Sequence, residues 1–248
     1  MESMNTADDF FETFGPRPVM IDELDSEQGM SMNVLVGCEF SGTVRDAFEA
    51  RGHNAWSCDL LPAPGKHIQG DVFEALKRGW DLAIVHPPCT YLCLSGIHWN
   101  ARRPERHQHT EDALNFVREL ISALHTHTQA WALENPASII STRIQKYTQE
   151  VQPYRFGHDA SKKTWLWLHN LPPLIPTVYI PPRIVVANGK EYRRWANQTD
   201  SGQNREPPSA DRWKKRAQTY KGIAEAMADQ WGSIRSLRQR LLFSGIDQ

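Results

Sequence analysis

The sequence of 248 residues predicts an α/β fold, in which helices cover both faces of a doubly wound, largely parallel sheet. Between residues 32 and 170, short apolar runs of strand length alternate with segments of helical periodicity, which is the pattern of such a fold. The runs are apolar at successive positions, as expected of strands buried on both faces. Polar or reactive residues follow several runs, and ligands of doubly wound folds bind at that end of the strands.

The first expected strand covers 33–36 and ends at Gly37, and a helix over 43–51 follows it. The clearest helix covers 109–127, because apolar residues recur there at i, i+3, i+4 and i+7. The other expected strands cover 54–58, 82–85, 130–134 and 163–168, and of these 82–85 is apolar at every position. The other expected helices cover 71–77, 139–147 and 222–231.

Composition is that of a globular protein, with 40% hydrophobic and 23% charged residues, enough to build a full core. There is no run of 18 apolar residues to predict a transmembrane helix, and the acidic N-terminus lacks the basic flank of a secretory signal. Without an export signal, the four cysteines favour free thiols in a reducing cytoplasm over a disulfide scaffold. We therefore expect a cytoplasmic protein without a membrane partner.

Acidic and basic residues are distributed unevenly along the chain. Residues 1–30 carry eight acidic residues and one basic residue, whereas the remainder carries 21 acidic and 27 basic residues. This pattern suits a body that binds a polyanion, and it equally suits a solvated tail kept for solubility. We expect a disordered acidic tail over 1–31, a catalytic domain over 32–170 plus 217–248, and a small, irregular, basic and proline-rich lobe over 171–216.

The segment 85–89, Val-His-Pro-Pro-Cys, places a thiol just after a predicted strand. Proline fixes its own φ and restricts the residue before it, so the two prolines give Cys89 a defined position at the edge of the sheet. An arbitrary cysteine is more often a small buried hydrophobe, but this position favours a reactive role. In the segment 133–136, Leu-Glu-Asn-Pro, Glu134 follows the next long strand; alone, it would be explained by the dipole of a following helix.

Together these two segments resemble those of the DNA cytosine-5 methyltransferase family and keep the family's order along the chain. The resemblance covers about residues 32–170 and 217–235. It includes weaker matches over 156–164 and 222–228, to the arginine-bearing motif and the C-terminal motif. It implies a sheet of the S-adenosylmethionine-dependent methyltransferase type, S-adenosyl-L-methionine as cofactor, and duplex or single-stranded DNA as substrate.

The resemblance also implies roles for individual residues. Cys89 would be the nucleophile and Glu134 the contact to the cytosine ring, while Lys162 and Thr164 take the places of the family's arginines. The segment 36–42 stands where the family has its glycine-rich cofactor loop. The residues implied to hold the cofactor are Gly37, Glu39, Phe40, Ser41, Gly42, Asp59, Leu60, Asp71, Val72 and Pro87.

The residue types also suit the chemistry without the family name. Carbon 5 of cytosine is a poor nucleophile until a thiolate adds to carbon 6, and cysteine is the side chain suited to that reversible addition. A neighbouring carboxyl must hold or protonate the ring nitrogen so that charge does not accumulate there. To reach the site, a base in duplex DNA must be flipped out of the stack.

The chain departs from the family in three places. Glu39 and Phe40 replace glycines of the cofactor loop, and Ala160, Lys162 and Thr164 replace the glutamine-and-arginine motif. The interval available for target recognition is only the basic lobe, which suits phosphate contacts more than base readout. We expect DNA contacts, with Trp195 and Trp213 as candidates for base stacking, at Ser95, Arg102, Arg103, Arg193, Arg194, Lys214 and Lys215.

Other hypotheses compete with this one. A zinc site from the cysteines has the wrong spacing, since Cys89 and Cys93 are separated by three residues and no second close pair exists, so no metal is expected. A zinc deaminase requires a His-x-Glu segment upstream of a Pro-Cys-x-x-Cys segment; no His-x-Glu precedes Cys89, and the Pro-Cys-x-x-Cys spacing is absent. A non-catalytic DNA-binding or decoy protein on the same fold, and transfer of a different electrophile to cytosine carbon 5, remain open alternatives. The sequence leaves the oligomeric state undetermined.

Overall fold

The structure, a computed structural model, describes residues 31–207, 209, 214 and 217–232. The chain divides into two units, 1–30 and 31–248, and all described residues belong to the second. The predicted acidic tail, apart from Ser31, lies outside the described residues.

Seven strands form one sheet in the order β3-β2-β1-β4-β5-β7-β6. All neighbouring strands are parallel except that β7 runs antiparallel to both β5 and β6. This confirms the predicted doubly wound, largely parallel sheet. The strands are β1 (Asn33–Gly37), β2 (Asn54–Asp59), β3 (His67–Gln69), β4 (Trp80–Val85), β5 (Thr128–Pro136), β6 (Gln149–Val151) and β7 (Thr164–His169).

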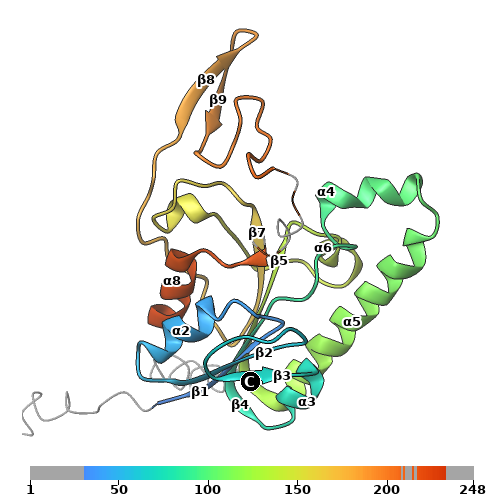
Figure 1. The fold of residues 1–248 in the computed structure, drawn as a ribbon, viewed down its shortest axis with the longest axis vertical. Coiled ribbons are helices and arrows are strands. Elements are labelled where there is room, and N and C mark those ends of the chain that lie inside the picture. Colours follow the sequence, from blue (N-terminus) through green and yellow to red (C-terminus); the bar gives the residue numbers. More distant parts are fainter. Residues whose placement is uncertain (1–30, 208, 210–213, 215–216, 233–248) are drawn as a thin grey trace, which may run out of the picture. The chain divides into compact units, whose positions relative to one another are not determined.

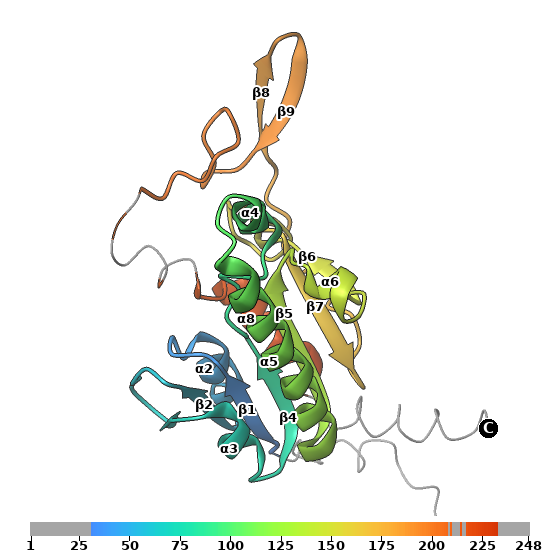
Figure 2. The ribbon, with the colours of Figure 1, turned by 90° about the vertical axis from the view of Figure 1, so that its right-hand side faces the viewer.

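Helices cover both faces of this sheet, as Figures 1 and 2 show. Helices α2 (Thr43–Glu49) and α8 (Lys221–Trp231) lie side by side on one face, and α3 (Val72–Leu76) and α5 (Arg106–His127) cover the other. Shorter helical segments are α4 (Leu94–Ile97), η2 (His98–Ala101), α6 (Ile140–Arg143) and η3 (Pro153–Arg155). Among the described residues, no helix combines the length and apolarity that a membrane span requires.

The side-chain alternation of β1 explains the two cores. Successive residues of a strand point to opposite faces. Val34 and Val36 therefore pack with α2 and α8, while Leu35 packs with α3 and α5. All three side chains are fully buried, which requires apolar residues at these three successive positions.

The strand order reverses direction between β1 and β4, so this pair is the topological switch point of the sheet. The crevice beyond the carboxyl ends of β1 and β4 is where such folds bind ligands. The backbone N–H of His86, just after β4, donates to the Gly37 carbonyl at the end of β1 (2.9 Å). The two strand ends are thus held together at the candidate site.

The helix predicted over 139–147 is shorter than expected and ends at Arg143. The residues that follow form hydrogen bonds to β7 instead of continuing the helix. Trp167 Nε1 donates to the Gln145 carbonyl (2.7 Å), and the Thr148 N–H donates to the Leu166 carbonyl (2.8 Å). These tertiary contacts draw the segment to the sheet edge, where β6 begins.

The basic lobe was predicted to be irregular. It instead contains a hairpin of two strands, β8 (Arg183–Ala187) and β9 (Lys190–Arg194). Asn188 and Gly189 both have positive φ in its turn, as a two-residue hairpin turn of the primed type requires. Both strands are mostly exposed on both faces, so no apolar alternation marks them in the sequence.

The packing at Gly37 generates a stability prediction. A Cβ on this residue would lie 2.7 Å from Val72 Cγ2 and 3.0 Å from Val85 Cγ1. Gly37→Ala should therefore lower the free energy of unfolding by about 1–3 kcal/mol, measured by urea denaturation. The control is Gly70→Ala, where a Cβ would meet nothing within 4 Å. Equal unfolding free energies for the two variants would contradict this close packing.

Candidate functional site

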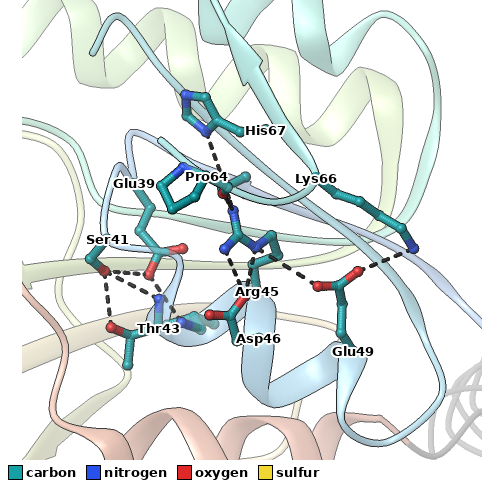
Figure 3. A network of polar contacts seen from close by, with 11 residues as sticks. Glu39, Ser41, Thr43, Arg45, Asp46, Glu49, Pro64, Lys66 and His67 are labelled. Atoms are coloured by element: carbon teal, nitrogen blue, oxygen red, sulfur yellow. Dashed lines mark hydrogen bonds and ion pairs between the residues drawn. The ribbon is translucent and has the colours of Figure 1, made fainter. Parts of the chain in front are cut away.

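The loop after β1 is built around a buried carboxylate. Glu39 Oε1 accepts hydrogen bonds from Ser41 Oγ (2.9 Å) and from the Val44 N–H (3.0 Å) in the first turn of α2 (Figure 3). Gly42 permits the sharp entry to the helix with a φ of 73°. The other carboxylate oxygen, Glu39 Oε2, is buried and has no hydrogen-bond partner within the described structure. One half of this side chain therefore caps a helix, and the other half is available to a ligand.

Arg45, on α2, fixes the loop between β2 and β3. Its buried guanidinium donates from Nη1 to Ser57 Oγ (3.0 Å) and to the Pro64 carbonyl (2.7 Å), and it pairs with Asp46 (Figure 3). His67 contacts the same Ser57 hydroxyl at 2.8 Å. The loop that begins at Asp59 is thereby tied to the helix that begins at the Glu39 loop.

The two acidic residues assigned to the cofactor converge on the same edge of the sheet. Asp59 Oδ1 accepts from the Leu61 N–H (2.9 Å), and Asp71 Oδ1 accepts from the Phe73 N–H (2.9 Å) as the N-cap of α3. Burial raises the pKa of the Cys38 thiol to about 12, and the charges of Asp59 and Asp71 add to that effect. The structure thus brings Cys38, Asp59 and Asp71 together beyond β1 and β2. Leu60 beside them is exposed.

The cysteine loop after β4 is bound to the end of β5. Asn135 Nδ2 donates to the carbonyl of Pro87 (2.9 Å), and both side chains are buried. Farther along the loop, the Leu94 N–H donates to the Ala137 carbonyl (2.8 Å), and the Ile139 N–H donates to the Leu92 carbonyl (2.9 Å). These bonds fix the position of Cys89, whose own carbonyl accepts from the N–H groups of residues 92 and 93.

Glu134 lies near the end of β5, opposite Leu166 of β7, with its side chain almost fully buried. Burial raises the pKa of this carboxyl, but the hydrogen bonds from His86 and Thr164 and the charge of Lys162 together outweigh burial and lower the pKa. The contact from His86 Nδ1 to Glu134 Oε2 is 3.4 Å long. Glu134 is therefore a carboxylate at neutral pH in the free protein.

The pKa of the Cys89 thiol is shifted in the direction opposite to that of Glu134. Burial raises the pKa of its thiol, and Cys93 and Glu134 raise it further, whereas Lys162 lowers it. In the free protein this thiol is therefore mostly protonated near neutral pH. Lys162 acts on both reactive groups, since its charge favours the ionised form of each.

Lys162 and Thr164 reach the site because β7 is antiparallel. Thr164 is the first residue of β7 and pairs with Pro136, so the amino end of β7 meets the carboxyl end of β5. Four residues predicted as catalytic, Cys89, Glu134, Lys162 and Thr164, thus gather at one edge. Sequence reasoning missed His86, which contacts Glu134; its position directly after β4 was the available signal.

The rim of the site is basic and aromatic. Arg106 Nη2 donates to the Thr90 carbonyl (3.3 Å), and its guanidinium lies 4.6 Å from the centre of the Tyr91 ring, so this arginine supports the cysteine loop. Arg102 and Arg103, which were predicted to contact DNA, lie over the exposed ring of Trp99 at 5.3 and 5.4 Å. Ser95 is exposed on the same segment.

The hairpin residues predicted to bind DNA differ in their surroundings. Arg193 is exposed, whereas Arg194 Nε donates to the Asp200 carbonyl (3.0 Å) and holds the following loop. The predicted stacking role of Trp195 is wrong for this conformation, because its ring is buried and stacked on Tyr154 at 4.0 Å. Lys214 is described and exposed, while Trp213 and Lys215 lie outside the described residues.

The two motifs matched weakly in the sequence contact each other. A Cβ on Gly222 would lie 1.9 Å from the Phe156 carbonyl oxygen, so no larger residue fits there. The Gly222 N–H also donates to His158 Nε2 (2.8 Å). The start of α8 is therefore fixed against the segment that leads to Lys162.

Comparisons with known proteins give little beyond this geometry. No family model matches the chain, and neither does any curated protein. A solved structure of the protein WbdD with a kinase inhibitor aligns at a TM-score of 0.36 and 17% identity, over 71% of this chain and 44% of that one. A structure of WbdD described as a bifunctional kinase-methyltransferase aligns at a TM-score of 0.35 and 18% identity, over 71% and 41%. This chain thus spans less than half the length of either structure, and these alignments carry no inference about activity.

The electrostatics predict the pH dependence of Cys89 reactivity. Because its thiol pKa is raised, the rate of alkylation by iodoacetamide should increase about tenfold per pH unit between about pH 6 and 9. Lys162→Met should slow alkylation at each pH, since removing the positive charge raises the thiol pKa further. Peptide mass spectrometry at Cys89 measures the rate.

The matched control is Lys163→Met, because the neighbouring lysine pairs with Glu150 (3.4 Å) instead. A plateau in the alkylation rate below pH 8, or equal effects of the two lysine substitutions, would contradict the electrostatic description of the site.

Proposed function

We propose that the protein methylates carbon 5 of cytosine in DNA, using S-adenosyl-L-methionine and a covalent adduct with Cys89. One observation carries this proposal: a cysteine and a carboxylate meet at the carboxyl ends of β4 and β5, on two segments bonded to each other. A structural thiol would not require a loop fixed in this way.

Cys89 would supply the nucleophile. In the adduct its sulfur bonds to carbon 6 of the ring, and the electron pair of the 5,6 double bond makes carbon 5 nucleophilic. Once carbon 5 has bonded to the methyl group that the cofactor would supply, with the cofactor sulfur leaving as a thioether, loss of the carbon-5 proton to a base and elimination of the Cys89 sulfur as thiolate would regenerate the aromatic ring. The raised thiol pKa means that the thiolate must form as the base enters, with Lys162 as the described group that favours it.

Glu134 would hold the base by accepting hydrogen bonds. As a carboxylate it is acceptor-only, which matches the cytosine amino group and a protonated ring nitrogen. His86 and Thr164 donate to it and keep its charge in place. Of the two roles considered from the sequence, this electrostatic state favours holding the ring over donating a proton to it.

The acceptors beyond β1 and β2 fit the donors of S-adenosylmethionine. The cofactor carries an ammonium group, ribose hydroxyls and an adenine amino group, and this edge presents Glu39, Asp59 and Asp71. The buried, unpartnered oxygen of Glu39 is the specific sign of a ligand here. When bound, the cofactor supplies an electrophilic methyl group.

The replacement of loop glycines by Glu39 and Phe40 favours a second candidate function, that of a protein that binds DNA without catalysis. Glu39 and Phe40 leave a less open loop than further glycines would, which would oppose cofactor entry. A pure binder, however, has no use for a fixed thiol beside a carboxylate. Transfer of a different electrophile to carbon 5 would use the same Cys89 and Glu134.

Incubation with isotope-labelled S-adenosylmethionine and mixed-sequence DNA, followed by nucleoside mass spectrometry, tests the proposal. Labelled 5-methylcytosine is expected from the unaltered protein, and Cys89→Ser should reduce it by about 10³-fold or more. The matched control is Cys93→Ser, in the same loop, which should retain product. Unmodified DNA would favour the binding protein, and a different carbon-5 substituent would favour the other electrophile.

The hairpin generates a separate prediction about DNA binding. If the hairpin binds DNA phosphates, Arg193→Gln should reduce the affinity for DNA equally on unrelated sequences. The slope of the logarithm of the binding constant against the logarithm of the salt concentration should become less steep by about one unit. Arg194→Gln should instead destabilise the loop that it holds, which is visible as faster proteolysis. An unchanged salt slope in Arg193→Gln would assign the phosphate contact elsewhere, with Arg102 and Arg103 as the next residues to test.

A further inference from the structure

A small cavity lies where β1 and β4 end, at the switch point of the sheet. Its volume is about 20 Å³, which is room for one heavy atom with its hydrogens. Its lining comes from the loop after β1, from the residue after β4 and from the segment before α8: Cys38, Glu39, Phe40, Ser41, His86, Ala217 and Thr219.

Two residues that line this cavity each carry a buried polar atom without a hydrogen-bond partner within the described residues. These atoms are Glu39 Oε2 and His86 Nε2. Glu39 as a residue is 6% exposed and the side chain of His86 is 9% exposed, so bulk water does not solvate them fully. A buried polar atom without a partner is unfavourable, and two such atoms on residues that line one cavity favour a common ligand.

The hydrogen bonds around His86 define what that ligand must offer. Glu134 is a carboxylate and accepts only, so His86 Nδ1 must carry the proton in their contact. In the neutral ring, His86 Nε2 is then an acceptor, and Glu39 Oε2 is an acceptor as well. Two acceptors on residues that line a cavity for one heavy atom require a ligand that donates at least two hydrogens.

Water and a primary ammonium group both meet that requirement, and charge favours the ammonium. Glu39 Oε1 is bound only by a hydroxyl and a backbone N–H, which leave the buried negative charge without a cation within the described structure. A buried carboxylate is strongly stabilised by a positive partner. The position also agrees, since ligands of this fold bind beyond these two strands.

We propose that Glu39 and His86 form the binding site for the α-ammonium group of the cofactor, and that His86 thereby connects cofactor binding to Glu134. This inference rests on the proposed function, because it assumes an aminoacyl cofactor. His86 is a positioning residue here: one ring nitrogen faces the ammonium and the other holds the carboxylate. Cofactor binding would order the group that contacts the base.

Calorimetry on the full chain tests this inference by measuring the affinities of two ligands for the unaltered protein and for its variants. The probes are S-adenosylhomocysteine and its analogue that lacks only the α-amino group. The unaltered protein should bind the amino compound at least about tenfold more tightly, as expected for a charge-assisted hydrogen bond. Glu39→Gln should remove most of this discrimination and leave the affinity for the deamino analogue nearly unchanged.

The matched control is Glu49→Gln, the same change on the adjoining helix. Glu49 pairs with Lys66 (3.1 Å), lies outside the cavity lining and should preserve the discrimination. His86→Gln should reduce the affinity ratio as Glu39→Gln does, which a merely structural histidine would not do. The comparison of the two probes on the unaltered protein needs no variant, so it holds even if a substitution impairs folding.

Two outcomes would overturn the inference, and they are distinguishable. Equal affinities of the unaltered protein for the two probes would mean that water occupies the cavity and would overturn the ammonium site. The proposal that the protein binds this cofactor would still stand. Binding of neither probe at millimolar concentration would overturn the proposed cofactor itself, and with it this assignment.

Discussion

The site depends on one buried hydrogen bond, from the Asn135 side chain to the carbonyl of Pro87. The two prolines before Cys89 have no N–H to donate, so the loop cannot fix itself through its own backbone there. Asn135 follows Glu134 directly, and its amide therefore sets the register between the thiol and the carboxylate. Without this bond, a buried carbonyl would lack its partner, and a penalty of about 1–3 kcal/mol would favour movement of the loop.

The two ionisable groups at this site, Glu134 and Cys89, differ in charge in the free protein. Burial disfavours the ionised form of both, but Glu134 has donors in His86 and Thr164, whereas Cys89 has carboxylate and thiol neighbours. The resting site thus holds a charged carboxylate and a neutral thiol. Because the thiolate is the form that oxidants and alkylating agents attack, a mostly protonated Cys89 is protected from both.

Much of this could be predicted from the sequence, because the parallel strands are apolar runs that end in reactive residues. Cys89 and Glu134 meet because β4 and β5 are parallel neighbours, a local consequence of the fold class. The contact of His86 with Glu134 was missed: its position directly after a predicted strand was a signal, but the direction of its side chain depends on the fold. Burial of Trp195 depends on Tyr154 from a distant segment, and the exposed hairpin carries no core-facing alternation.

The packing of α8 beside α2 has a consequence for synthesis of the chain. The face of the sheet formed by Val34 and Val36 is closed in part by Met227 and Trp231, which are far away in sequence. As the chain leaves the ribosome from its N-terminus, α2 covers part of that face, but the rest stays uncovered until α8 emerges. The core on this face therefore cannot be completed until α8 has been synthesised.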